Sequence, residues 1–319
     1  MVSWSALTAG FAFPECDRCP YVLAVVSLRH RNYPSHIDSE GMRLTFHGVR
    51  GSTPCHGEEI RRYGGNTSCV ELSIPGDPPL LLDLGTGVRY AGTAHGDVAS
   101  VNCLLGHLHW DHIQGLPFYS PALRAGTSIT IHGPAQSDGR GVGDTLRSVV
   151  TPPMFPVSID EFPAAFEFVD HGDDEFTVGS TMVLSRLVPH IGPTLGYRVS
   201  WGGCSVAYIS DHQEPLNGEV CSSGVRELCS GVDVLIHDAQ YLDADFIGHE
   251  TWGHCRVDYA LRLAESCGVK TLVLFHHDPA RDDDALDAVA STAAEWGREH
   301  GIAVVTASEG LIIEVTGAG

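Results

Sequence analysis

The chain has 319 residues, of which 43% are hydrophobic and 18% charged, so it holds enough apolar material for a large core. Its 40 acidic and 19 basic residues give a formal net charge of −21. This balance disfavours a long nucleic acid as partner, because such binding depends on Lys and Arg. No apolar run reaches the roughly 18 residues that span a bilayer, and no secretory signal is recognisable. We therefore expect a soluble, cytoplasmic protein without a membrane partner.

The first part of the chain differs from the rest. Residues 1–41 show no sustained hydrophobic periodicity, and they end in a polar stretch, 32–41. We expect a disordered N-terminal extension there, with an ordered extension as the alternative. A single folded domain is predicted for residues 42–319, and Met42 is an alternative start of the chain.

Short apolar segments separated by turn residues predict strands along the rest of the chain. These strands are expected at 43–47, 69–74, 80–84, 101–105, 128–132, 182–188, 197–201, 205–210, 232–237, 271–276, 303–307 and 311–315. Helices are expected at 142–149, 257–267 and 285–300, the last preceded by acidic residues that suit a helix N-terminus. We predict an α/β fold in which helices cover two facing sheets, a four-layer αββα sandwich.

The predicted strand 101–105 runs directly into a group of metal-binding residue types. Residues two apart in an extended chain point the same way, so His107 and His109 share one face. Asp111 and His112 then start a short helix, whose N-terminus stabilises a carboxylate. Imidazole and carboxylate groups gathered at one strand end predict a site for zinc, manganese or iron.

Further polar residues follow other predicted strands. They are Asp83, His190, Asp211 and His276. Each by itself fits a turn, a surface loop or a helix cap, but all four occur at strand ends. His277 competes with His276, and because neighbours in a strand point to opposite faces, one of the two is expected to bind metal. We favour His276, since it directly follows the apolar strand.

The His-x-His-x-Asp-His string and these later segments, taken in order, resemble the metallo-β-lactamase superfamily from about residue 43 to the C-terminus. The resemblance implies two divalent metal ions, with zinc preferred and manganese as the alternative. One ion would be held by His107, His109, His190 and Asp211, and the other by Asp111, His112, Asp211 and His276. Asp83 would orient a metal-binding histidine without itself binding a metal ion.

Residues 234–240 and 248–254 resemble paired motifs of the phosphodiesterase branch, which includes ribonuclease Z and the cyclic-nucleotide and phosphonate-pathway phosphodiesterases. The resemblance implies that Asp238 orients His254, which protonates a leaving alkoxide. This chain has Asp238 where the branch has Glu, and Gln240 where it has Thr. A turn cap and a helix N-cap are the alternative roles of the pair.

We therefore predict a dinuclear phosphodiesterase for a small phosphodiester such as a cyclic nucleotide, in which Asp111 steers the nucleophile. Ribonuclease Z-like RNA processing is an alternative, although residues 126–189, where that enzyme has a basic arm, are rich in Asp and Glu. A lactonase or thioesterase on the same fold, or a metal-stabilised nucleotide-binding module, would also use the predicted ligands. Relatives of this branch are often homodimers. Phe162 and Phe166 are expected either to wall a substrate pocket or to pack in the core.

Overall fold

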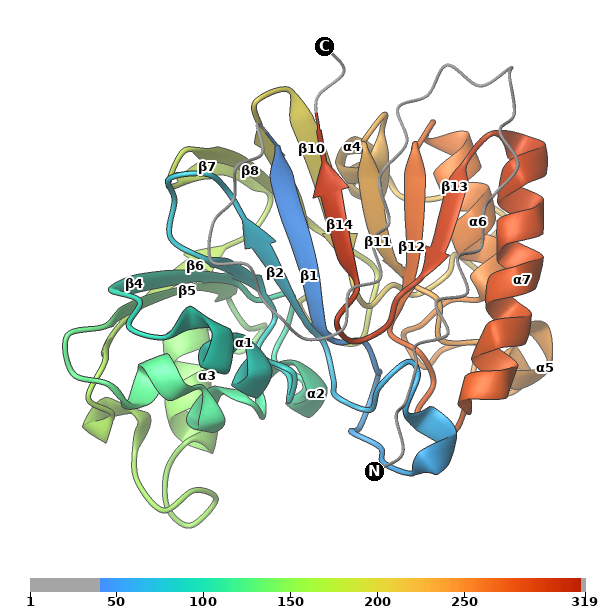
Figure 1. Cartoon of the computed structure of the whole chain (residues 1–319). Coiled ribbons are helices and arrows are strands. Elements are labelled where there is room, and N and C mark those ends of the chain that lie inside the picture. Colours follow the sequence, from blue (N-terminus) through green and yellow to red (C-terminus); the bar gives the residue numbers. More distant parts are fainter. Residues whose placement is uncertain (1–40, 317–319) are drawn as a thin grey trace, which may run out of the picture.

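A computed structural model describes residues 41–316, so almost all of the predicted extension, 1–41, lies outside the described residues. Within residues 41–316 two seven-stranded sheets pack face to face, and helices cover the outer face of each (Figure 1). The predicted four-layer αββα sandwich is therefore confirmed. No helix in this range is long and apolar enough to cross a membrane.

The first sheet consists, in spatial order, of β14 (Ile312–Val315), β1 (Met42–Gly48), β2 (Cys69–Ser73), β3 (Leu80–Leu82), β4 (Ser100–Leu104), β5 (Ser128–Pro134) and β6 (Ala165–His171). Strand β1 pairs antiparallel with β14 and β2, and β2 and β3 form an antiparallel hairpin. Strands β3 to β6 are parallel, so their carboxyl ends lie at one edge of the sheet.

The second sheet consists, in spatial order, of β13 (Ala303–Thr306), β12 (Thr271–Phe275), β11 (Val234–Asp238), β10 (Cys204–Ile209), β9 (Leu195–Trp201), β8 (Thr181–Leu187) and β7 (Asp174–Val178). Strands β10 to β13 are parallel, whereas β7, β8, β9 and β10 are joined antiparallel. The loops after β10, β11 and β12 therefore leave the sheet on the same side, which is where open α/β sheets bind ligands.

Helices of the first half are α1 (Val88–His95), α2 (Trp110–Ile113) and α3 (Val142–Val149). Helices of the second half are α4 (Ser223–Cys229), α5 (Asp243–Phe246), α6 (Val257–Ser266) and α7 (Asp283–His300). Short 3-10 helices η1 (Glu58–Ile60), η2 (Leu116–Phe118), η3 (Ser120–Leu123) and η4 (Ile159–Glu161) lie in the connections. Helices α1 and α3 pack on the first sheet, and α4, α6 and α7 pack on the second.

Alternation along the strands produces the layers. Leu80 and Leu82 point into the core between the two sheets, whereas Leu81 points outward to the helices of the first half. In the second sheet Tyr208 joins the central core, and its neighbour Ala207 packs under α4 and α6. Both faces of these strands are buried, which explains their nearly continuous apolar sequences.

A buried charge network on β2 gives a first testable prediction. The Glu71 carboxylate lies 3.0 Å from His47 Nε2 and 3.1 Å from His95 Nε2, and its side chain is only 13% exposed. Burial alone would raise the pKa of Glu71, but the two histidines outweigh it and hold that pKa below its usual range. Removing the carboxylate leaves two buried imidazoles without this partner. We expect Glu71→Ala to lower the free energy of unfolding by about 3 kcal/mol.

Urea denaturation at neutral pH measures this change. The matched control is Glu58→Ala, which breaks the exposed ion pair with Arg61 and should change stability by less than about 1 kcal/mol. Since the pKa of Glu71 is lowered in the folded state, its contribution is present at neutral pH and is lost as the pH falls through that pKa. Equal effects of the two substitutions would contradict the role given to Glu71.

Candidate metal centre

The candidate ligands lie in loops that leave the carboxyl ends of strands in both sheets. His107 and His109 follow β4, Asp211 follows β10, and His276 follows β12. His190 lies between β8 and β9. These loops meet at the edge of the sandwich where α2 lies, at the bottom of Figure 1. The predicted ligand side chains form two adjacent groups there, which share the carboxylate of Asp211.

The first group consists of three imidazoles and one carboxylate oxygen. His109 Nδ1 lies 2.9 Å from His107 Nε2 and 3.3 Å from His190 Nε2. Asp211 Oδ2 lies 3.7 Å from both His107 Nε2 and His190 Nε2. Four ligand atoms arranged tetrahedrally around zinc are about 3.4 Å apart, so these separations suit zinc. Burial lowers the pKa of all three histidines, which favours the neutral form that binds metal.

The second group is more deeply buried. His112 Nε2 lies 3.2 Å from Asp111 Oδ2 and 3.1 Å from Asp211 Oδ1. His276 Nε2 lies 3.1 Å and 3.4 Å from the same two oxygens. Asp211 thus turns Oδ2 toward the first group and Oδ1 toward the second, so it could serve as a ligand in both.

Two buried atoms of the second group have the chemistry of cation ligands. His112 Nε2 and Asp211 Oδ1 are buried and have no hydrogen-bond partner among the described residues, although they lie 3.1 Å apart. Buried polar atoms nearly always have partners, and a metal ion would satisfy both. Burial would raise the pKa of Asp211, but His276 and His112 outweigh it and keep that pKa well below its usual range. The carboxylate is therefore ionised, as a metal ligand must be.

Asp83 supports the second group from behind. Its Oδ2 accepts hydrogen bonds from His112 Nδ1 and from the Tyr208 hydroxyl, both at 2.7 Å, and its Oδ1 accepts one from the Gly106 amide at 2.7 Å. Burial lowers the pKa of His112, but the carboxylates of Asp111, Asp211 and Asp83 outweigh it and raise that pKa. When the imidazole gives up a proton to bind metal, Asp83 keeps the remaining one on Nδ1, and Nε2 has the lone pair that faces the ligand group. Asp83 has the left-handed backbone φ of 63°, which is rare for a residue with a Cβ.

Two other histidines are oriented in the same way. His190 Nδ1 donates to the Gly253 carbonyl at 2.7 Å, and a carbonyl only accepts, so Nε2 is the nitrogen that faces the first ligand group. His276 Nδ1 lies 3.0 Å from Gln240 Oε1, and its Nε2 faces Asp111. Gln240, where this chain departs from the related motif, thus contacts a candidate ligand directly.

The geometry distinguishes His276 from His277. His276 has a φ of 58°, which turns its ring back toward the two ligand groups. His277 Nε2 instead lies 2.9 Å from the Ala307 carbonyl, and burial lowers the pKa of His277 to about 3. The predicted choice of His276 agrees with this arrangement.

The loop after β1 contributes contacts that the sequence did not predict. Ser52 donates its backbone amide to Asp111 Oδ2 at 2.7 Å. A Cβ at Gly51 would lie 2.4 Å from His276 Nδ1 and 2.7 Å from Gln240 Oε1, so only glycine fits there. Gly51 therefore leaves room for the candidate ligand His276.

Asp238 and His254 lie beside the ligand groups. Asp238, at the end of β11, is fully buried and its Oδ2 accepts from His254 Nδ1 at 2.9 Å and from the His212 amide at 3.0 Å. His254 Nδ1 lies 3.8 Å from Asp211 Oδ2. Burial lowers the pKa of His254, but the charge and hydrogen bond of Asp238 outweigh it and raise that pKa to about 9. A third group of side chains close enough together to hold a metal ion consists of Asp238, His254 and His276. Asp238 Oδ2, however, already accepts two hydrogen bonds.

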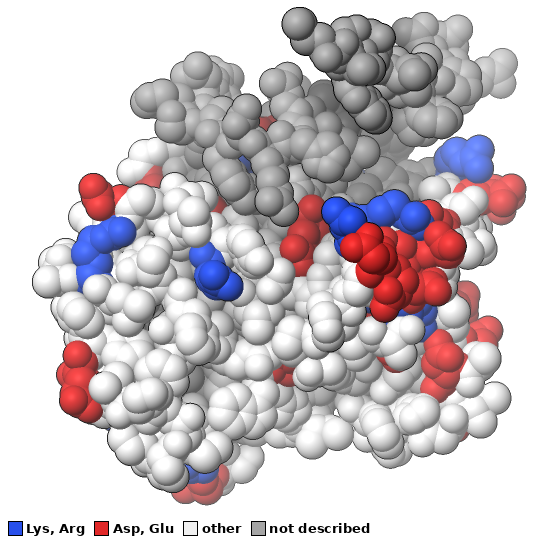
Figure 2. Space-filling model, turned by 60° about the horizontal axis from the view of Figure 1, so that its bottom comes forward, with Lys and Arg blue, Asp and Glu red and all other residues white. Residues whose placement is uncertain are grey.

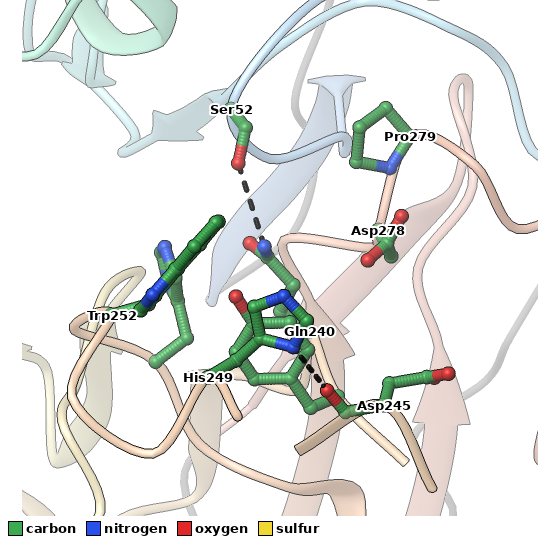
Figure 3. Close-up of a pocket in the computed structure, with 9 residues that line it drawn as sticks. Ser52, Gln240, Asp245, His249, Trp252, Asp278 and Pro279 are labelled. Carbon is green, nitrogen blue, oxygen red and sulfur yellow. Dashed lines mark hydrogen bonds between the residues drawn. The ribbon is translucent and has the colours of Figure 1, made fainter. Parts of the chain in front are cut away.

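A pocket of about 340 Å³ opens next to His254 (Figure 3). It is lined by Ser52, Gln240, Tyr241, Asp245, His249, Trp252, His254, Asp278 and Pro279. Phe162 and Phe166 do not line it, because they pack with other aromatic rings against the outer face of the first sheet. Their packing role is therefore the correct alternative, and the pocket residues, apart from His254, were not predicted.

Known proteins resemble this chain in sequence and in fold. A family described as "Beta-lactamase superfamily domain" matches residues 91–277. An uncharacterized protein of Mycobacterium tuberculosis is 32% identical over 240 residues, which cover 72% of this chain and 81% of that protein. Ribonuclease Z of Nocardia farcinica is 29% identical over 240 residues, covering 62% of this chain and 77% of the enzyme.

The fold has solved counterparts as well. The crystal structure of the metallo-β-lactamase fold protein YhfI from Bacillus subtilis superposes with a TM-score of 0.63 at 19% identity, and it covers 86% of this chain and 100% of that one. The family match, the relatives and the two groups of ligand side chains agree with one another. The chain therefore belongs to the metallo-β-lactamase superfamily of hydrolases, in the phosphodiesterase-like branch that contains ribonuclease Z.

Proposed function

We propose that this protein is a dinuclear-metal phosphodiesterase that hydrolyses a small phosphodiester such as a cyclic nucleotide. The observation that carries the proposal is the Asp238–His254 pair, held 3.8 Å from the candidate bridging carboxylate of Asp211. A phosphodiester leaves an alkoxide, which is a poor leaving group and needs a proton donor. Strained lactones and thioesters do not share that need, so the pair favours a diester over a carbonyl substrate.

The candidate ligands would hold two divalent ions, zinc by preference and manganese as the alternative. Bound ions of this kind supply Lewis acidity and make water acidic enough to attack at neutral pH. Within the chain, Asp111 would bind an ion through Oδ2, which the Ser52 amide holds in place, and we assign Asp111 to orient the attacking water and to accept its proton. Asp83 and Gln240 keep the imidazoles of His112 and His276 turned toward the ligand groups.

His254 would supply the other proton transfer. Its Nδ1 is hydrogen-bonded to Asp238, so Nε2 is the atom left to face the substrate. With a pKa raised to about 9, the imidazole carries a second proton at neutral pH and can donate it to the leaving oxygen. Asp238 stabilises the cation before transfer and fixes the ring plane. The pair therefore acts as an oriented general acid.

Processing of RNA is the second candidate, because several curated relatives are named ribonuclease Z. The charge distribution supports a compact substrate instead. On the described part of the face in Figure 2, Lys and Arg side chains are scattered and do not form a continuous basic stripe. Arg62 pairs with Asp284 and Asp287. Long nucleic acids need several unpaired cations along their phosphates.

One panel of substrates tests the proposal. Protein of measured metal content is incubated with bis(p-nitrophenyl) phosphate, 2′,3′- and 3′,5′-cyclic nucleotides, a precursor transfer RNA and a lactone. We expect the highest kcat/KM for a cyclic nucleotide. A higher kcat/KM for the lactone would indicate a carbonyl hydrolase, and a higher value for the transfer RNA would indicate RNA processing. Metal-dependent binding without turnover would indicate a binding module. We also propose, as we expected from the sequence, that the protein is cytoplasmic and forms a homodimer.

A further inference from the structure

The pocket beside His254 has one wall of aromatic rings. The indole of Trp252 is 58% exposed and meets the ring of His249 edge to face, with centroids 4.4 Å apart. His249 in turn stacks on Tyr241 at 5.5 Å. The rings support one another, while much of the Trp252 indole faces no protein. In Figure 3 Trp252 and Pro279 lie on opposite sides of the pocket, with Ser52 and Gln240 between them in this view.

A second wall offers hydrogen-bond acceptors. Asp245 and Asp278 both line the pocket. Asp245 Oδ2 is bound by Arg281 at 2.7 Å, and Asp278 Oδ1 accepts from the Ala280 amide at 2.8 Å, which fixes both carboxylates. Each retains a second oxygen that can accept from a ligand. Negative charge here repels a phosphate and attracts N–H donors, so an amino group suits this wall better than an anion does.

The pocket and the metal centre share residues. His254 lines the pocket and also lies 3.8 Å from Asp211. Gln240 lies 3.0 Å from His276 Nδ1, and its amide nitrogen lies 3.4 Å from the Ser52 hydroxyl. A substrate whose phosphate sits at the candidate metal ligands therefore extends its next substituent into this pocket. The acidic wall and the metal centre together orient such a molecule.

We propose that this pocket binds a nucleobase that carries an amino group, stacked on Trp252, with Asp245 and Asp278 accepting from the base edge. The inference rests on the proposed function, because it assigns the substituent of the diester substrate. Stacking of a base on an aromatic side chain is tolerant of sequence, whereas the carboxylates select for donors. The pocket thus determines which phosphodiesters are bound well.

Binding to zinc-loaded protein tests the stacking without turnover. Calorimetry compares AMP with ribose 5-phosphate, which lacks the base. We expect Trp252→Ala to weaken AMP binding about tenfold more than ribose 5-phosphate binding, and Trp252→Phe to restore most of the affinity. The matched control is Ile247→Ala, which removes an apolar side chain that is 77% exposed in the same loop and does not line the pocket. Equal weakening of both ligands by Trp252→Ala would overturn the stacking.

A matched pair of pyrimidines tests the acceptor wall. CMP carries an amino group where UMP carries a carbonyl, and we expect CMP to bind about tenfold more tightly, as one hydrogen bond to a charged group predicts. Asp278→Asn should reduce this difference. Equal affinities for CMP and UMP would overturn the assignment of the carboxylates. If the protein hydrolyses diesters but Trp252→Ala weakens AMP and ribose 5-phosphate equally, only this inference fails. If Trp252→Ala selectively weakens AMP but the protein hydrolyses no diester, the proposed phosphodiesterase function fails instead.

Discussion

Replacing His254 by alanine is expected to slow hydrolysis of an alkyl phosphodiester, such as a cyclic nucleotide, by about 10²–10⁴-fold. The same substitution should slow bis(p-nitrophenyl) phosphate much less, because nitrophenolate leaves without a proton. The prediction follows from the 2.9 Å hydrogen bond between His254 Nδ1 and Asp238, which fixes the orientation of the His254 ring. Steady-state kcat on the two substrates measures the difference.

Two further variants separate proton donation from a structural effect. Asp238→Asn keeps the shape of the side chain but removes the charge that raises the pKa of His254, so we expect the same dependence on leaving group with a smaller loss. His300→Ala, at the exposed end of α7, should change neither rate. Equal losses of His254→Ala on both substrates would show that His254 does not act as the acid.

Replacing Asp211 by alanine should remove activity on every substrate. Its two oxygens face different ligand groups, at 3.7 Å from His107 Nε2 and 3.1 Å from His112 Nε2. Loss of a residue that only orients a ligand costs about 10–100-fold in metal affinity or activity, so loss of the shared ligand should cost more than 100-fold. The variant should also retain less metal after dialysis, measured by elemental analysis.

The control for this variant is Asp258→Ala on α6, where the carboxylate is half exposed and pairs with Arg262. We expect it to keep its metal and its activity. Circular dichroism should show that Asp211→Ala retains its secondary structure, since the side chain contributes little to the apolar core. Full activity of Asp211→Ala would rule out a shared pair of ions at this position.

The sequence predicted the central strands well because both of their faces are buried. The segment 43–47 became β1 (Met42–Gly48), and 271–276 became β12 (Thr271–Phe275) with His276 directly after it. Polar residues that interrupt such apolar runs stand out, so the candidate ligands at strand ends were identified without the structure. The order of strands in the sheets was not predictable, because it depends on contacts between distant segments.

Other elements carry weaker signals. Strand β6 (Ala165–His171) lies at a sheet edge and alternates exposed acidic residues with half-buried aromatic ones, so the sequence indicated only an acidic stretch. Helix α1 (Val88–His95) contains glycine and a threonine, which lower helix propensity. The contact between Gln240 and His276 joins residues 36 positions apart, and the pocket wall at Trp252 forms only when its loop folds beside the metal centre.

The metal content of the purified protein tests the central claim most directly. Mass spectrometry of the elements, on protein purified without chelator and then dialysed against zinc or manganese, should find about two transition-metal ions per chain. Chelator treatment should remove them together with the activity, and readdition should restore both. A protein that arrives without metal, cannot be loaded and still hydrolyses phosphodiesters would contradict the account.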